Sequence, residues 1–243
     1  RLSGKLIHLE RNTDHSKMVG NVPDKVEHVL GFAGAKSHLS LEAGWTNQWV
    51  APGGLLIAPY LGVRGDLVQY DGGSSHGAAP AADLVYSATP IAALDVSWPL
   101  VGTDSSGTKH YFAPRLQIVS RGGPTNTGIT NDDAQSFVFD DSNLFSFNRF
   151  SGEDRQDSGT RVAIGAQYNA DFGNGRWVDI VVGQSYQLGG TNAMAVANPN
   201  QTGLGSGADV SPSYIVAGIQ GAPLDGVTLG AKTLVDPQNG RVA

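Results

Sequence analysis

Apolar and polar residues alternate along most of this sequence, and this period of two restricts the fold more than any other feature. Leu39 and Trp45 share one face of an extended chain, for example, and Glu42 lies on the other. Successive side chains of a β-strand point to opposite faces, so such runs predict strands with one apolar and one polar face. The pattern predicts nine strands, at residues 2–10, 37–50, 55–70, 83–100, 108–120, 160–172, 176–189, 212–221 and 226–236, with residues 26–36 ambiguous.

The links between these strands alternate in length. Short links lie at 51–54, 101–107, 173–175 and 222–225, and long links at 11–36, 71–82, 121–159 and 190–211. In an up-and-down meander this alternation puts all long loops at one end of the strands and all tight turns at the other. That arrangement is typical of outer-membrane barrels, and runs of about ten residues suit strands that cross a membrane at a tilt. We therefore expect an all-β fold, an antiparallel up-and-down section of a transmembrane β-barrel.

Residues 1–243 are interpreted as part of one outer-membrane β-barrel domain. The sequence does not begin with Met, so we expect a processed chain or a fragment. Trp45, Trp49 and Trp98 lie near tight turns on apolar faces, where they suit an interfacial aromatic girdle. Trp177 has the parity of a polar face and fits less well. Core tryptophans of a soluble barrel are the alternative.

Composition excludes several functions. The chain has no Cys, which excludes disulfides, Cys-ligated zinc and thiol catalysis. Its net charge of -6 argues against general nucleic-acid binding. No apolar run reaches the roughly 18 residues of a spanning helix, so a helical membrane protein is excluded. The six His form neither HExxH nor another metal spacing, and no GxSxG nucleophile elbow is predicted. We predict no catalytic residue, no metal site, no cofactor and no nucleic-acid partner.

Two charged groups leave alternatives open. Calcium prefers oxygen ligands, which are offered by Asp132, Asp133, Asp140 and Asp141. Their spacing is not that of an EF-hand, so a solvated acidic loop is favoured. Arg64 and Asp66 frame an Arg-Gly-Asp tripeptide of the adhesion type. Because both fall on the polar face of a strand, a cross-strand ion pair in the lumen is favoured.

Strand parity also nominates polar positions that face the lumen of the barrel. These nine are Glu42, Arg64, Asp66, Asp95, Arg115, Gln117, Arg161, Asn169 and Asp171. The opposite face carries few charges. That fits a lipid environment, where a charge at the bilayer midplane costs roughly 2–4 kcal/mol.

The longest loop, residues 121–159, holds an aromatic and charged cluster. Five of the eight Phe lie between Phe137 and Phe150, whereas disordered segments are poor in aromatics. Charge-assisted bonds are expected to fix the loop, between Arg149, Arg155 and Arg161 on one side and Asp140, Asp141, Glu153 and Asp154 on the other. We expect an ordered loop that either plugs the barrel mouth or caps its outer surface through Phe packing.

A long motif within this loop carries a family resemblance. Residues 131–155 read NDDAQSFVFDDSNLFSFNRFSGEDR, followed by SGTR at 158–161 and VGQSY at 182–186. Upstream lie PGG at 52–54, LGVRGD at 61–66 and APR at 113–115. Together these stretches cover most of residues 37–190 and resemble the lipopolysaccharide-assembly outer-membrane protein family LptD, also called OstA or Imp. Glu153 stands where the family usually has a tyrosine or a similar residue, and the cysteines of some members are absent.

The resemblance implies a non-enzymatic section of the translocon that inserts lipopolysaccharide into the outer leaflet of the bacterial cell outer membrane. Such a protein is a very large barrel behind a periplasmic β-jellyroll. The implied partners are lipopolysaccharide, a plug lipoprotein like LptE, a periplasmic bridge protein like LptA that acts through the jellyroll, and outer-membrane lipids. Nine strands cannot close so large a barrel, so the chain would be a middle-to-late section of its wall.

We predict that the part of the long loop that carries the family motif packs against or into the barrel mouth and helps to close it. The positions carried over are Asp140, Asp141, Asn143, Leu144, Phe145, Arg149, Gly152, Asp154 and Arg155. Two other functions stay open. A passive porin would need a polar constriction, often a ring of charges, and would conduct ions steadily. A soluble all-β enzyme or adhesin would stay in solution without detergent.

Overall fold

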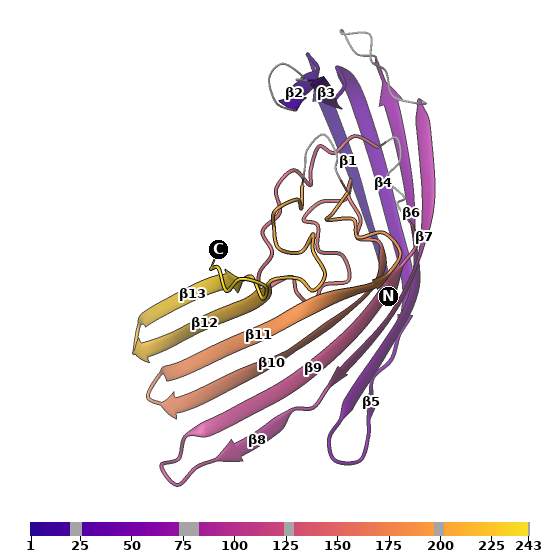
Figure 1. Ribbon diagram of the computed structural model, residues 1–243. Coiled ribbons are helices and arrows are strands. Elements are labelled where there is room, and N and C mark those ends of the chain that lie inside the picture. The colour runs from indigo at the N-terminus through magenta and orange to yellow at the C-terminus, as the bar shows by residue number, and fades with distance from the viewer. Residues whose placement is uncertain (20–25, 73–82, 124–128, 197–201, 243) are drawn as a thin grey trace.

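The computed structural model describes residues 1–19, 26–72, 83–123, 129–196 and 202–242. These residues form an all-β structure (Figure 1). The strands are β1 (Leu2–Arg11), β2 (His15–Val19), β3 (Val26–Gly31), β4 (Gly34–Thr46), β5 (Trp49–Val50), β6 (Leu56–Asp71), β7 (Leu84–Ser97), β8 (Leu100–Thr103), β9 (Lys109–Arg121), β10 (Gly159–Gly173), β11 (Arg176–Gly189), β12 (Ile215–Leu224) and β13 (Val227–Val235). In the described ranges no helix is long and apolar enough to span a membrane.

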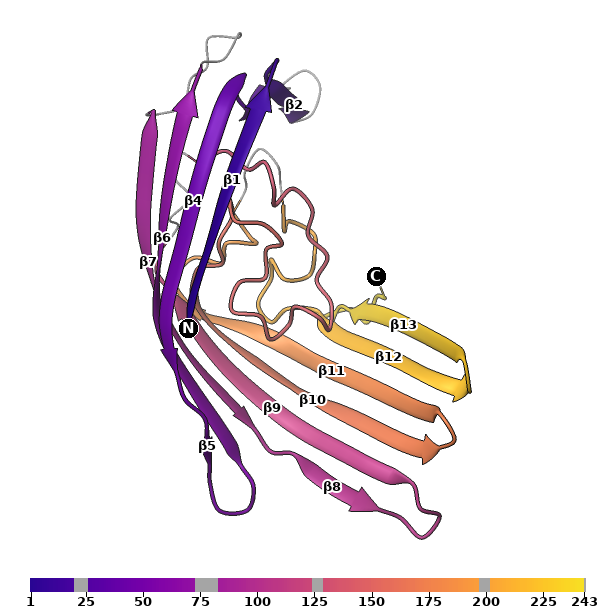
Figure 2. The same cartoon turned by 180° about the vertical axis from the view of Figure 1, so that it is seen from behind.

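The main sheet is an antiparallel meander. Its order is β1-β4-β6-β7-β9-β10-β11-β12-β13, while β5 pairs with β6 and β8 with β9. The hairpin of β2 and β3 forms a separate two-stranded sheet between β1 and β4. The sheet curves without closing (Figures 1 and 2), as a section of a barrel wall would. The predicted all-β, antiparallel, up-and-down fold is confirmed.

Each of the nine predicted strands corresponds to one strand of the meander, but two of them are interrupted. The predicted strand 37–50 breaks at Asn47 and Gln48. Opposite them β6 carries Pro59, which has no N–H for the ladder, and the side chain of Asn47 accepts the backbone N–H of Gln48 at 2.9 Å. The predicted strand 83–100 ends at Ser97 for a related reason, because Pro99 separates β7 from β8.

Several predicted links also need correction. The link 11–36 contains the β2–β3 hairpin, and residues 34–36 already belong to β4. The second tight turn lies at 104–108 rather than 101–107, where Asp104 Oδ1 accepts the backbone N–H groups of Ser106 and Thr108 at 2.8 and 3.0 Å. The fourth turn is reduced to Asp225 and Gly226. The predicted link 71–82 lies mostly outside the described residues.

The sheet exposes its apolar face and buries its polar face, which is the opposite of the burial pattern in a soluble protein. On β4, Leu41 and Trp45 are 51% and 50% exposed, whereas Lys36, His38 and Ser40 are buried. The exposed apolar side chains of the other strands continue this surface. An apolar outer face with a polar inner face is the pattern of a barrel wall in lipid.

The polar face is buried because two links lie on the concave side of the sheet, as both views show (Figures 1 and 2). We call residues 129–158 the inner segment, and residues 190–196 with 202–214 the companion segment. The inner segment follows β9 and the companion segment follows β11. Both therefore start from the end of the sheet opposite the tight turns.

Candidate functional site

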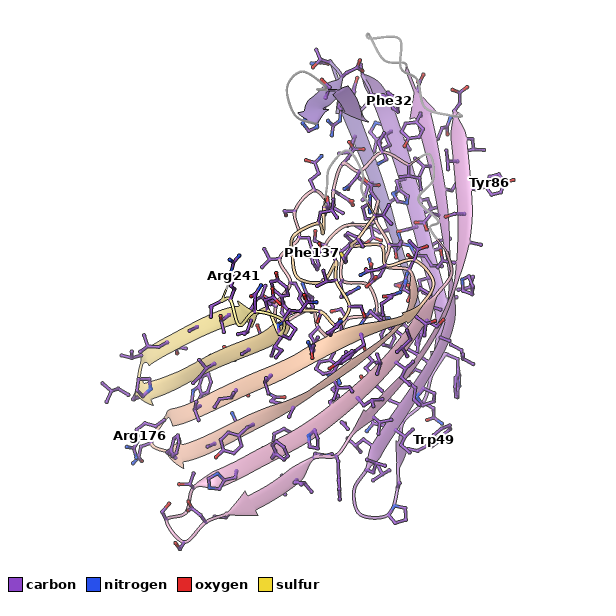
Figure 3. The ribbon with its side chains drawn as sticks, viewed as in Figure 1. Phe32, Trp49, Tyr86, Phe137, Arg176 and Arg241 are labelled. Atoms are coloured by element: carbon purple, nitrogen blue, oxygen red, sulfur yellow. The ribbon has the colours of Figure 1, made fainter. Side chains whose placement is uncertain are left out.

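A buried apolar core joins both segments to the sheet. Its members are Ala134, Phe139, Leu144 and Phe150 of the inner segment, Ala193, Met194 and Ala208 of the companion segment, and Ala163 and Val216 of the strands. Phe137, labelled in Figure 3, packs at its border. Phe139, Leu144 and Met194 are each at most 1% exposed, and burying such a side chain contributes about 1.5–3 kcal/mol. The inner segment is therefore a packed part of the fold.

A compact turn precedes Leu144 in the inner segment. Asp140 Oδ1 accepts the backbone N–H of Ser142 at 2.8 Å. Asn143 Oδ1 accepts the backbone N–H of Asp140 at 3.1 Å, and its Nδ2 donates to the carbonyl of Val138 at 2.7 Å. These side chains satisfy backbone groups that have no strand partner. The turn places Leu144 against the sheet.

Two strand glycines form the seat for this turn. Gly165 and Gly183 lie opposite each other on β10 and β11. A Cβ on Gly183 would lie 2.5 Å from Leu144 Cδ2, and one on Gly165 would lie 3.2 Å from the ring of Phe145. The glycines therefore leave the shallow site that Leu144 and Phe145 fill. We call this contact the apolar seat.

The neighbouring acidic pair is held by a cation of the protein itself. Lys232 Nζ lies 3.0 Å from Asp140 Oδ2 and 2.7 Å from Asp141 Oδ1. Asp132, which the sequence groups with them, instead pairs with Arg11 at 2.7 Å and with Lys36 at 2.8 Å. Within the described ranges no three His, Cys, Asp or Glu side chains gather as metal ligands.

A carboxylate between two guanidinium groups fixes the end of the inner segment. Asp157 accepts from Arg149 Nε at 2.6 Å and Nη2 at 3.0 Å, and Arg161 Nε lies 3.4 Å away. Burial raises the pKa of Asp157, but the charge of Arg149 and its hydrogen bonds outweigh burial and hold the pKa below its ordinary value. Arg161 also donates to the carbonyls of Leu144 and Ser146. It thus ties the seat to β10.

The arginine partners predicted from the sequence are therefore wrong. Arg149 and Arg161 pair with Asp157, which was not among the expected carboxylates. Arg155 lies over the ring of Phe150 at 5.2 Å and donates to the carbonyl of Ala193 at 3.4 Å. The sequence indicated that these three arginines hold the loop, but it did not indicate their partners.

The opposite flank of the inner segment meets the wall through charged side chains. Asp154 Oδ1 lies 2.9 Å from His38 Nδ1 and 2.8 Å from Lys36 Nζ, both on β4. The other ring nitrogen of His38 lies 2.9 Å from Asp66 Oδ1 on β6. Arg64 binds Asp66 at 2.7 Å and Glu153 at 2.5 Å. We call this cluster the polar junction: Lys36, His38, Arg64 and Asp66 on the wall, with Asp132, Glu153 and Asp154 on the inner segment.

The polar junction corrects the expectation for the Arg-Gly-Asp tripeptide. Arg64 and Asp66 do pair, but along a single strand rather than across two. Both side chains are buried. The second partner of Arg64 is Glu153, at the position where the family usually has a tyrosine or a similar residue.

Backbone hydrogen bonds shape the inner segment at the junction. Asp133 accepts the backbone N–H groups of Glu153 and Asp154 at 2.8 and 3.0 Å. Gly152 is required beside them, because a Cβ there would collide with the Asp133 carboxylate. Burial raises the pKa of Asp133. Burial also raises the pKa of Asp154, but the hydrogen bond from His38 and the charge of Lys36 outweigh it and lower that pKa to about 2.

A cavity of about 500 Å³ lies on the concave face on the tight-turn side of the inner segment. Asp95 lines it, accepting from Arg115 Nε at 3.0 Å and Gln117 Nε2 at 2.8 Å. Arg115 also lies over the ring of Phe145 at 4.5 Å, and Phe147 packs on Tyr60 with centroids 5.0 Å apart. The polar wall residue Arg115 thus contacts the inner segment at Phe145.

Three nominated positions take no part in holding the inner segment. Glu42 accepts the hydroxyl of Tyr60 at 2.7 Å. Asp171 accepts the backbone N–H of Gly173 at 2.9 Å near a tight turn. Asn169 is half-buried on β10. Within the described residues none of the three bonds to the inner segment.

Sequence reasoning missed several residues that hold the inner segment. His38 was considered only as one of six histidines without a metal spacing, although its parity already placed it on the polar face with Glu42. Lys36 fell in a stretch assigned to a loop. Asp157 and the companion segment carry no periodic pattern, so nothing in the local sequence marks them.

These features define the class: a curved antiparallel membrane-barrel wall whose polar inner face is covered by its own inward-folded links. A comparison with protein families agrees with this and is more specific. The profile of the LptD family, described as LPS transport system D, matches residues 5–243. The chain belongs to this family of outer-membrane lipopolysaccharide transport proteins, which is not a class of enzymes. No curated protein matches the sequence.

Proposed function

We propose that residues 1–243 are part of one β-barrel domain in the bacterial outer membrane, and that this domain belongs to the translocon that inserts lipopolysaccharide into the outer leaflet. Membership of the lipopolysaccharide transport family and the exposed apolar outer face support this proposal. The task is transport without bond chemistry. The inner segment has the role of closing the barrel mouth.

One observation carries the closing role: the motif segment is buried on the concave face by contacts on two opposite flanks. The apolar seat holds Leu144 on β10 and β11. The polar junction holds Asp154 on β4 and β6 through His38. A segment held at both flanks spans the lumen side of the wall.

The inner segment should separate from the wall more readily at one flank than at the other. Apolar side chains buried in the core would each lose about 1.5–3 kcal/mol on exposure. Buried ion pairs carry a desolvation cost of several kcal/mol per ion that largely cancels their attraction, and separated charges regain water. We therefore assign the apolar seat as the fixed flank and the polar junction as the flank that opens for a passing lipid.

The remaining polar wall suits protein contact. Asp95, Arg115 and Gln117 form a hydrogen-bonded group beside the cavity. This group would face a plug lipoprotein like LptE in the lumen. A bridge protein like LptA would deliver lipopolysaccharide through a jellyroll that is outside these residues.

Depletion of the full-length protein tests the translocon role. Newly made lipopolysaccharide is labelled at the cell surface and compared with total synthesis. We expect the surface fraction to collapse while synthesis continues. Normal surface delivery would contradict the proposal and would favour a passive channel, for which the purified full-length protein should conduct ions steadily.

Deletion of residues 137–155 tests the closing role separately. The barrel should still assemble, because the wall strands pair with one another without this segment. Cells should become permeable to large antibiotics that the intact outer membrane excludes. Unchanged permeability would rule out the closing role.

A further inference from the structure

A groove of about 520 Å³ crosses β11, β12 and β13 near their tight turns. Phe172, Val178, Ile219 and Leu229 line it around Gly221. These residues lie on the outer face of the wall. On β12, Val216 points inward into the buried core, so Ile219 and Gly221, at odd positions, point outward.

The groove is hollow because its centre has no side chain. Gly221 pairs with Val178 on one side and with Leu229 on the other. A Cβ at Gly221 would lie 2.6 Å from the carbonyl oxygen of Trp177, so the backbone itself keeps this position empty. Ala231 continues the low floor along β13. The flanking side chains are large, so the hollow is bounded on both sides.

The charged side chain of Arg176 lies at the tight-turn end of the groove. Arg176 begins β11 and lines the groove, and Figure 3 labels it at this end of the sheet. Its side chain is exposed. Within the described residues it has neither an ion pair nor a side-chain hydrogen bond. A guanidinium group binds phosphate oxygens through two parallel hydrogen bonds.

We propose that this groove binds an acyl chain of a glycerophospholipid whose phosphodiester headgroup is bound by Arg176. The volume of the groove lies in the range of about 300–1,000 Å³ for ligand pockets. The positive charge of Arg176 lies at one end of this apolar groove. The choice of lipid rests on the proposed membrane orientation, in which tight turns face the periplasm. The adjacent leaflet of an outer membrane is built of phospholipid, whereas lipopolysaccharide occupies the opposite leaflet.

Native mass spectrometry of the purified full-length protein, titrated with phosphatidylglycerol, tests the site. We expect Ala231→Trp, which fills the groove, to remove one bound lipid. Arg176→Gln should weaken that binding about tenfold. Lys109→Gln is the matched control, because Lys109 is an exposed strand-end cation without an ion pair in the described residues. It should bind lipid like the wild type.

Equal lipid occupancy in all four proteins would overturn the proposal, as would an equal loss in the control. Preference of the groove for lipopolysaccharide over phosphatidylglycerol would overturn the choice of lipid. A photo-crosslinking residue can also be placed at position 229 in cells. If it captures protein in place of phospholipid, the choice of lipid is overturned. Surface lipopolysaccharide is measured on the same variants, so failure of the translocon role is distinguished from failure of the groove.

Discussion

His38 and Asp154 lie 116 positions apart in the sequence, yet His38 Nδ1 is 2.9 Å from Asp154 Oδ1. Both side chains are at most 2% exposed. His38 belongs to β4 and Asp154 to the inner segment, and the second ring nitrogen of His38 contacts Asp66 on β6 at 2.9 Å. One imidazole therefore connects two wall strands with the segment that covers them.

The substitution His38→Ala should release the inner segment from the wall. Asp66 keeps Arg64 and Asp154 keeps Lys36 as partners, but the group that bridges the two carboxylates is lost, and a hydrogen bond to a charged group contributes about 1.5–3 kcal/mol. The apolar seat and the strand ladder are untouched, so the barrel should assemble. We expect increased sensitivity to a large glycopeptide antibiotic, measured as the minimal inhibitory concentration.

Asp171→Asn is the control for this change. Asp171 is also a polar strand residue, but within the described residues its bond is to the backbone N–H of Gly173 near a tight turn. It should leave antibiotic sensitivity unchanged. If His38→Ala cells resist the antibiotic as well as the wild type does, the polar junction does not hold the mouth closed.

Gly183→Ala should disturb the apolar seat. The new Cβ would lie 2.5 Å from Leu144 Cδ2 and 2.8 Å from the carbonyl oxygen of Ile164. Overpacking of this kind costs about 1–3 kcal/mol. We expect trypsin added to intact cells to cut the inner segment after Arg149 or Arg155 faster than in the wild type.

Gly102→Ala gives the matched comparison for the seat. No atom of the described residues lies within 4 Å of the Cβ that this change would add to β8. Its cleavage rate should equal that of the wild type. Equal rates in Gly183→Ala as well would show that the glycine is not needed for the seat.

Acid should weaken the polar junction through Asp154. Its pKa is lowered to about 2 in the folded protein, below the ordinary value of about 3.9 for an aspartate. A lowered pKa stabilises the folded state above the ordinary value, and this contribution is lost as the pH falls through about 2. Pepsin cleavage of the inner segment should therefore accelerate between about pH 4 and pH 2. Asp154→Asn should show a weaker pH dependence, and identical profiles would contradict this role.

The wall was predictable because its signal is local. The period of two placed Arg64, Asp66 and Arg161 on the polar strand face, and no knowledge of distant residues was needed. The strand breaks were also accessible, since Pro59 and Pro99 lack the N–H that a ladder needs. The alternation pattern alone did not take account of how these prolines interrupt pairing between adjacent strands.

The contacts of the inner segment could not be predicted in the same way. Which carboxylate meets Arg149, or which strand meets Asp154, depends on the path of a link without any period. Met194 is fully buried, but it stands in a stretch with no apolar alternation. Family resemblance marked the motif of the inner segment, whereas its wall partner His38 lies 116 positions from Asp154.

Locking the polar junction should block lipid delivery if that flank has to open. Ser40 Oγ on β4 lies 3.4 Å from Glu153 Oε2 on the inner segment, and this sequence has no cysteine of its own. Ser40→Cys with Glu153→Cys, joined by a short reducible thiol cross-linker in cells, should lower the surface fraction of new lipopolysaccharide several-fold. Reduction of the cross-link should restore delivery, because the wall and the segment are then separable again.

A cross-link within the wall distinguishes gating from general rigidity. Ser120 and Thr160 lie on the paired strands β9 and β10, with hydroxyl oxygens 2.9 Å apart. Ser120→Cys with Thr160→Cys joins these strands without holding the inner segment, so lipopolysaccharide delivery should continue. Normal delivery with a complete Ser40–Glu153 cross-link would show that lipid passes while the junction stays closed. The polar flank would then be a permanent contact, and the opening would have to lie elsewhere in the barrel.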